Sequence, residues 1–312
     1  MFLQSKGKIA VLIGCSAEYE VSLMTAHGVA SALDESGYSH VTLDIDTHLP
    51  AKLLQECPDA VFIASHGTNA EDGRVQGLLD ILGFPYVGSG VLASSLAMSK
   101  HKAKLIFQQM GLRTPASCVF SRDTYSEELL GSVYDQLKRS GVVVKPEKQG
   151  SSIGISMVTR VDDLLLAIEE ALRYDDAVMI EWMIKGVELS VPVLGDKVLE
   201  ALPCVEIAPM NTFYDYEAKY TPGMSDHLIP PRVEQCIIDE AKSMAIAAHR
   251  ALGCRDLSRS DFMVDEHGCW LLEVNTLPGM TPTSLVPDAA RALGWSYADF
   301  IDKLVRMALD RA

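Results

Sequence analysis

The first part of the chain alternates short apolar runs with segments of helical periodicity, and this alternation leaves few possible folds. Apolar runs at residues 9–13, 41–45 and 60–64 predict buried strands, and helical spacing at residues 21–33 and 76–82 predicts helices around them. Strands that alternate with helices form parallel sheets, and functional loops follow the carboxyl ends of such strands. We therefore expect an N-terminal α/β unit with functional loops after its first and third strands.

The pattern changes near residue 100 and predicts two further units that mix helices and strands. The expected helices cover residues 100–110, 162–172, 233–252 and 297–309, with Asp162 as the N-cap of the second. The expected strands cover residues 141–145, 178–182, 188–194, 262–264 and 270–274. We expect an α/β protein, α+β in parts, with domains at residues 1–98, 99–186 and 187–312.

Composition narrows the possible functions. A formal charge of −15 over 312 residues disfavours nucleic-acid binding, although an acidic enzyme can bind nucleotide phosphates in a cleft that gathers lysines and metal ions. The seven cysteines are scattered without paired spacing, which is typical of reduced thiols in a cytoplasmic protein. The apolar run at residues 9–13 is too short for a signal peptide or a membrane span.

Two carboxylates and an amide lie at matching positions on two predicted strands. Glu273 and Asn275 are two residues apart, so their side chains leave the same face of a strand. Asp261 would join them if the turn at residues 265–268 closes a hairpin, and these oxygen ligands suit Mg²⁺. The alternative is a strand followed by a Pro-Gly turn. Arg259 would lie on the same face, either in a simple ion pair or directed at a developing oxyanion.

A Gly/Ser loop and an aromatic segment are two further candidates. Lys145 ends a predicted strand, and the loop QGSSIG that follows has N–H and hydroxyl donors for phosphate, although it is no Walker A loop and a surface turn is the alternative. The segment at residues 211–220, NTFYDYEAKY, has neither strand alternation nor helical spacing. It predicts an active-site lid, or else a packed surface loop.

With these segments in view, the chain resembles the D-alanine–D-alanine ligases of the ATP-grasp superfamily. The resemblance covers nearly the whole chain in six motifs in the family's order: SAEYEVS, HGTNAEDGRVQG, VVVKPEKQGSSIG, TFYDYEAKY, LGCRDLSRSD and LLEVNTLPGMTPTSLVP. It implies three α/β domains with ATP between the second and third. The implied reaction joins two D-alanines through an acyl phosphate, for peptidoglycan precursors, in a cytoplasmic homodimer.

The resemblance also implies which residues hold the nucleotide and the metal. The residues implied at ATP are Lys100 and Lys145 for the phosphates, Gly150, Ser151 and Ser152 in the loop that closes over them, Glu181 at the adenine hinge and Glu188 at the ribose. The implied metal site is two Mg²⁺ ions, with Mn²⁺ as an alternative, held by Asp261, Glu273 and Asn275.

A second group of residues is implied at the amino acid substrates. The implied residues are Glu18 and His66 for the first substrate, Ser284, Leu285 and Lys219 for the second, Arg259 and the Gly279 N–H for the oxyanion, and Glu18, Ser151 and Tyr220 for a latch that holds the lid and excludes water. Relatives that form D-alanyl-D-lactate typically carry His near position 220, so Tyr220 favours an amine as the second substrate.

The chain departs from the family pattern at a few positions. These are Cys15, Tyr19, Ala70, Ser99 and Asp256. The first two flank Glu18 and bear on the first-substrate pocket. Other functions compatible with the motifs are a related ligase for other amino or hydroxy acids and a nucleotide-binding regulator without catalysis. A Rossmann dehydrogenase is disfavoured because GCSAE, rather than G-x-G-x-x-G, follows the first strand.

Overall fold

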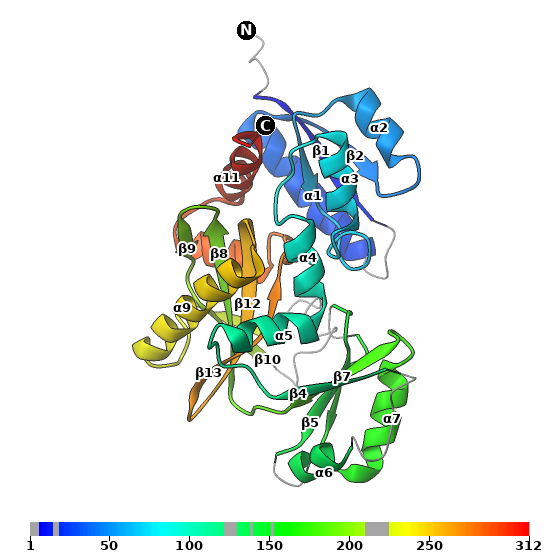
Figure 1. Ribbon diagram of the computed structural model, residues 1–312. Helices are drawn as coiled ribbons and strands as arrows, with labels where there is room; N and C mark the ends of the chain where they lie inside the picture. Colours follow the sequence, from blue (N-terminus) through cyan, green and yellow to red (C-terminus); the bar gives the residue numbers. More distant parts are fainter. Residues whose placement is uncertain are drawn as a thin grey trace.

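The computed structural model describes residues 6–14, 19–121, 130–137, 140–150, 153–209 and 225–311, and it contains three sheets. The sheet built by the last part of the chain lies between the other two, as Figure 1 shows. This arrangement confirms the expected α/β class with α+β parts. No described helix combines the length and the apolar character that crossing a membrane requires.

The first sheet is parallel, as the alternation of strands and helices predicts. Its strand order is β2-β1-β3. The strands are β1 (Lys8–Ile13), β2 (Ser39–Asp44) and β3 (Ala60–Ile63), and the helices beside them are α1 (Tyr19–Ser36), α2 (Leu49–Glu56) and α3 (Arg74–Leu82). Every residue of β3 is buried, which explains the continuous apolar run of its sequence. Because β1 and β3 are parallel neighbours, their carboxyl ends lie at the same edge of the sheet.

The second sheet is antiparallel and small. Its order is β4-β7-β5-β6, with strands β4 (Ser117–Ser121), β5 (Val142–Pro146), β6 (Ser156–Val158) and β7 (Ala177–Trp182). Helices α6 (Gly131–Leu137) and α7 (Val161–Ala171) belong to the same unit. The prediction of Asp162 as the N-cap is wrong, because Arg160 occupies the cap position. Asp162 lies in the first turn of α7, where a carboxylate is still favoured by the helix dipole.

The third sheet has six strands and carries much of the candidate site. Its order is β11-β10-β8-β12-β13, with β9 paired to β8. The strands are β8 (Val187–Gly195), β9 (Leu199–Ala201), β10 (Val205–Pro209), β11 (Ser225–Leu228), β12 (Asp256–Asp265) and β13 (Gly268–Asn275). Strand β12 is longer than the sequence pattern predicts because it pairs along its length with both β8 and β13.

Three helices pack on the third sheet through one apolar core. They are α4 (Val91–Met98), α5 (Lys100–Gln109) and α9 (Gln235–Leu252). Phe107 of α5 is fully buried in the core that also contains Val191, Phe262 and Leu271 of the sheet. Helix α5 therefore connects the second unit to the third. The domain boundaries at residues 98 and 186 remain predictions.

The last two helices return to the first sheet. They are α10 (Leu285–Ala292) and α11 (Tyr297–Leu309), and α11 packs against α1 and β3. One core contains residues of both ends of the chain, including Val11, Leu33, Phe300 and Leu304. Beyond α11, Arg311 pairs with the buried Asp256 at the start of β12. The N-terminal unit is thus completed by C-terminal residues.

Candidate active site

The hairpin of β12 and β13 brings the predicted polar residues together. Asp261 lies opposite Glu273, and Arg259 lies opposite Asn275. Residues opposite each other on antiparallel strands share a face of the sheet, so all four side chains leave the same face. The register shifts just after this group, between Asp261 and Phe262. The hairpin predicted from the turn at residues 265–268 is confirmed.

Asp261 is held by hydrogen bonds on both of its carboxylate oxygens. Arg259 donates from Nε to Oδ1 at 2.9 Å and from Nη2 to Oδ2 at 2.7 Å. Ser190 Oγ donates to Oδ1 at 2.7 Å, and Asn275 Nδ2 donates to Oδ2 at 3.0 Å. A bidentate Arg–carboxylate pair fixes both partners in one orientation. The ion-pair alternative for Arg259 is therefore present in the structure.

Glu273 connects the hairpin to the phosphate-loop region. Its Oε2 lies 3.4 Å from Lys100 Nζ, and the same Nζ donates to the Gln149 carbonyl oxygen at 2.6 Å. Lys100 is the first residue of α5 and is buried. It bridges the carboxylate of β13 and the backbone that precedes Gly150. Lys100 is thus placed between the expected metal ligands and the expected phosphate loop.

A buried cluster of one carboxylate and two lysines lies on the second sheet. Lys145 of β5 and Glu181 of β7 are diagonal neighbours on one face, with Nζ and Oε2 2.7 Å apart. Lys104 of α5 makes an ion pair with the other oxygen, Oε1. Burial alone would raise the pKa of the Glu181 carboxyl, but the two lysines together hold that pKa below its usual value.

Lys104 is a further member of this cluster that neither the local sequence pattern nor the family resemblance predicts. It is 1% exposed, and its Nζ donates to Thr114 Oγ1 at 2.6 Å. Lys100 and Lys104 are four residues apart on α5, and this spacing places two side chains on the same face of a helix.

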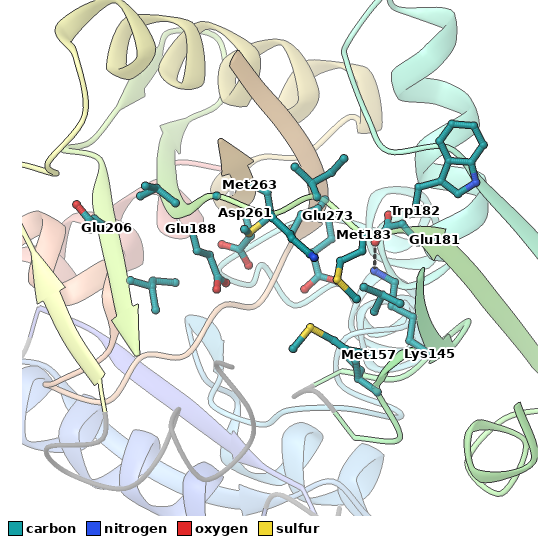
Figure 2. Close-up of a pocket in the computed structure, with 18 of the residues that line it drawn as sticks. Lys145, Met157, Glu181, Trp182, Met183, Glu188, Glu206, Asp261, Met263 and Glu273 are labelled. Atoms are coloured by element: carbon teal, nitrogen blue, oxygen red, sulfur yellow. Dashed lines mark hydrogen bonds and ion pairs between the residues drawn. The ribbon is translucent and has the colours of Figure 1, made fainter. Parts of the chain in front are cut away.

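A cavity of about 560 Å³ lies between the second and third sheets, and we call it the sheet cavity. Figure 2 shows Lys145 and Glu181 on one side and Glu188, Asp261 and Glu273 on another. Apolar side chains fill much of the remaining wall, among them Met157, Ile184, Met263 and Leu272. This combination suits a ligand with a flat apolar part and a charged part.

A second cavity of about 490 Å³, which we call the loop cavity, lies between the first and third units. Its walls include the predicted residues His66, Gly150, Arg259, Glu273, Asn275, Gly279, Ser284 and Leu285. Glu273 is shared by both cavities. Ser284 Oγ accepts the Thr281 N–H at 3.1 Å, which shapes the loop around Gly279. A Cβ at Gly279 would lie 3.2 Å from that Oγ, so a larger residue would press on Ser284.

The loop cavity also contains charged residues that the sequence reasoning missed. Glu71 Oε1 lies 3.4 Å from His66 Nδ1, and His227 Nδ1 lies 2.6 Å from Asp288 Oδ2. Glu71 and His227 both line this cavity. Glu71 belongs to the quoted motif HGTNAEDGRVQG, but no local pattern directs its side chain toward His66. His227 of β11 contacts Asp288 of α10, a residue distant in the sequence.

Several predicted residues lie outside the described part of the chain. They are Glu18, Ser151, Ser152, Lys219 and Tyr220, together with the expected lid at residues 211–220. Within the described part, no group of three or more His, Cys, Asp or Glu side chains gathers as a metal site. The expected metal ligands are instead two carboxylates and one amide. That set matches Mg²⁺, which takes one or two carboxylates and completes its shell with substrate phosphates and water.

Two of the departures from the family pattern have clear structural partners. Ser99 Oγ donates to Glu147 Oε1 at 2.5 Å, just before the start of α5. Asp256 has a left-handed backbone with φ of 60°, is fully buried, and accepts the Gly88 N–H at 2.8 Å and the Arg311 guanidinium. Neither residue lines the two cavities.

Comparison with known proteins agrees with this geometry. The family models "D-ala D-ala ligase N-terminus" and "D-ala D-ala ligase C-terminus" match residues 49–89 and 106–306. The chain is 46% identical to the D-alanine–D-alanine ligase of Halalkalibacterium halodurans over 308 residues, which cover 97% of this chain and 100% of the relative. It is 44% identical to the ligase of Pelotomaculum thermopropionicum, with 97% of each chain covered.

Solved structures give the same result for the fold. The D-alanine–D-alanine ligase of Bacillus anthracis complexed with ATP superposes with a TM-score of 0.85 at 29% identity, covering 98% of each chain. The VanG D-Ala:D-Ser ligase of Enterococcus faecalis gives 0.82 at 30% identity, covering 98% of this chain and 100% of the other. From its sequence, its fold and the two cavities that meet at Glu273, the chain belongs to the D-alanine–D-alanine ligase family of ATP-grasp enzymes.

Proposed function

We propose that this protein joins two D-alanine molecules at the expense of ATP and supplies the dipeptide for peptidoglycan precursors. The observation that carries the proposal is the position of Glu273 in the walls of both cavities. A group shared by two sites can serve a phosphate donor on one side and its acceptor on the other. Family membership supports the reaction, and the shared Glu273 supports its proposed location between the two cavities.

The nucleotide occupies the sheet cavity in this proposal. The adenine lies among the apolar side chains, with Glu181 at its edge and Glu188 at the ribose. Lys145 and Lys100 are point charges for the phosphates, and the loop that begins at Gly150 closes over them. Lys145 lines the cavity, and Lys100 is already in contact with Glu273. The solved relative that holds ATP supports this ligand.

Asp261, Glu273 and Asn275 hold the metal in this proposal. Their carboxylate and amide oxygens lie on one face of the hairpin, and both carboxylates line the cavity given to the nucleotide. When bound, Mg²⁺ neutralises charge that the β- and γ-phosphates share during transfer. Arg259 and Ser190 keep Asp261 oriented, and Lys100 keeps Glu273 near the phosphates.

The amino acids bind in the loop cavity, next to the shared Glu273. The first D-alanine's carboxylate attacks the γ-phosphorus, forming an acyl phosphate and releasing ADP. The second D-alanine's amine, after losing a proton, attacks the acyl carbon, and inorganic phosphate leaves as the amide bond forms. The attack of the amine forms a tetrahedral oxyanion, which lasts until phosphate leaves. Arg259 and the Gly279 N–H stabilise this oxyanion. His66 borders the first substrate, while Ser284 and Leu285 receive the carboxylate of the second.

The roles of Glu18, Ser151, Ser152, Lys219 and Tyr220 stay predictions from the family resemblance. A cytoplasmic location belongs to the proposal as well, supported by six described cysteines that are all free thiols. The expected homodimer is a further prediction, and light scattering coupled to size-exclusion chromatography would test it.

A ligase that takes a different second substrate is the alternative, because the D-Ala:D-Ser ligase VanG shares the fold at a TM-score of 0.82. A substrate panel separates the two. ADP release is measured with D-alanine alone and with D-alanine plus D-serine or D-lactate, with L-alanine as the control. We expect D-alanine alone to stimulate ADP release and to yield the dipeptide. No stimulation by D-alanine would refute the proposal, and preferential formation of a mixed product would favour the alternative.

A further inference from the structure

Glu181 has two lysine partners although it carries a single negative charge. Lys145 contacts Oε2, and Lys104 contacts Oε1. The two lysines differ in where they lie. Lys145 lines the sheet cavity, whereas Lys104 is 1% exposed and is absent from the cavity wall. Only Lys145 is in a position to leave Glu181 for a ligand in the cavity.

Lys104 is fixed in place from behind the cavity. Its Nζ donates to Thr114 Oγ1 at 2.6 Å, and that hydroxyl donates to the Leu271 carbonyl oxygen at 2.7 Å. Leu271 belongs to β13, two residues before Glu273. A chain of contacts therefore runs from the strand that carries Glu273, through Thr114 and Lys104, to Glu181. Each of these links is buried.

This arrangement leaves Glu181 a counter-charge when a nucleotide binds. If Lys145 turns to a phosphate, a buried carboxylate loses a counter-charge, and an unpaired buried charge is strongly unfavourable. We infer that Lys104 is a positioning residue that remains with Glu181 as its permanent counter-charge, so that Lys145 can exchange the carboxylate for a nucleotide phosphate. The inference rests on the proposed placement of the nucleotide in the sheet cavity.

Replacing Lys104 tests the inference because the two halves of the nucleotide should respond differently. In Lys104→Met, Lys145 is the one counter-charge that the described residues still offer Glu181, and it stays there. We expect the Kd of ADP with Mg²⁺ to rise by about tenfold or more, the loss of one charge-assisted hydrogen bond to phosphate. Adenosine has no phosphate, so its Kd should change by less than about threefold. Calorimetry measures ADP, and ligand-observed NMR measures adenosine.

Four further variants isolate the charge effect, and one of them, Glu181→Gln, is the reference for the double variant. Lys102→Met is the matched control, because Lys102 is an exposed residue of the same helix and should leave both affinities unchanged. Lys104→Arg keeps the charge and should retain ADP binding. Lys104→Met/Glu181→Gln removes the buried carboxylate together with its partner, so its ADP affinity should recover to that of Glu181→Gln. The two charge-conserving designs also keep the test usable if Lys104→Met folds poorly.

The outcomes separate this inference from the placement on which it rests. Equal weakening of ADP and adenosine in Lys104→Met would overturn it, since a merely structural role moves both. Unchanged ADP affinity in Lys104→Met, or a double variant as weak as Lys104→Met, would also overturn it. Lys145→Met tests the placement itself: if that variant binds ADP as the wild type does, the nucleotide lies elsewhere and the proposed site fails first.

Discussion

The two cavities meet at Glu273 but are built from different kinds of structure. Most of the charged residues of the sheet cavity lie on strands, among them Lys145, Glu181 and Asp261, whereas Lys185 and Arg232 lie on loops. The loop cavity is walled mostly by segments that follow strands, including the one at residues 277–284. Strand register fixes charges in the first, whereas loop contacts and the packing of the units set the shape of the second. We therefore expect a substitution in the sheet cavity to act mainly through the charges that face the nucleotide. A substitution in the loop cavity should act mainly through the positions of the loop residues that contact the amino acids.

The largest effect is expected at the residue that both cavities share. Glu273→Gln keeps the size of the side chain and removes the charge that faces Lys100 and the proposed metal. We expect kcat to fall by about a thousandfold or more, as for the loss of a central electrostatic group. Steady-state ADP release measures it, with Glu200→Gln at an exposed position of β9 as the control. A change in the KM of ATP alone would assign Glu273 to one cavity only.

The next largest effect is expected at Arg259. Its substitution distinguishes a role at the oxyanion from a role in orienting Asp261. It lines the loop cavity and holds Asp261, which lines the sheet cavity. We expect Arg259→Ala to lower kcat by about a hundredfold to a thousandfold and to change the KM of ATP little, because an oxyanion group acts mainly in the transition state. If ATP binding weakens by a similar factor, the chief role of Arg259 is to orient Asp261.

Ser284 should affect the loop cavity alone. Ser284→Ala removes a hydroxyl that we assign to the carboxylate of the second D-alanine. A hydrogen bond to a charged group contributes about 1.5–3 kcal/mol, so the KM of that substrate should rise about tenfold to a hundredfold. Initial rates at varied D-alanine and varied ATP separate the two KM values. Ser296→Ala is the control. Ser296 lines neither cavity, and its hydroxyl caps α11. If the KM of ATP rises by a similar factor in Ser284→Ala, the two cavities do not bind the amino acids and the nucleotide separately.

The smallest effect on catalysis is expected at His249, which lines neither cavity. Burial lowers the pKa of this imidazole to about 4, with Arg250 opposing its charge and Asp196 favouring it. The unfolded chain protonates this group near pH 6.5, so between pH 6.5 and 4 the unfolded state binds more protons and stability falls as the pH falls. The loss from pH 7 to pH 5 is about 2 kcal/mol for this group.

Urea unfolding at the two pH values checks that contribution. His249→Gln removes the titration, so we expect its stability to fall by about 2 kcal/mol less than that of the wild type over the same change. The KM of ATP and of D-alanine at pH 7 should stay at their wild-type values. Identical pH dependence in the two proteins would contradict the low pKa of His249.

The contrast between the cavities also explains what could be predicted from the sequence. The pairing of Asp261 with Glu273 follows from a side-chain period of two and a short turn, both local properties. The contact of Glu71 with His66 and the approach of His227 to Asp288 depend on how loops and separate elements pack, which no window of sequence records. Lys104 is an intermediate case: its helical spacing is local, but its partner on β7 is not. The prediction of which residues contact the amino acid substrates therefore depends most on the family resemblance.

The shared core of the first sheet and α11 has a consequence for how the molecule is made. Residues 9–63 leave the ribosome long before residues 297–309, yet both contribute to one apolar core. The nascent N-terminal unit must therefore expose the surface that Phe300 and Leu304 later cover. Such contacts between distant parts of a chain form late and slowly. We expect the first unit to reach its native structure only after α11 has been synthesised, and the growing chain to expose an apolar surface that chaperones can bind until then.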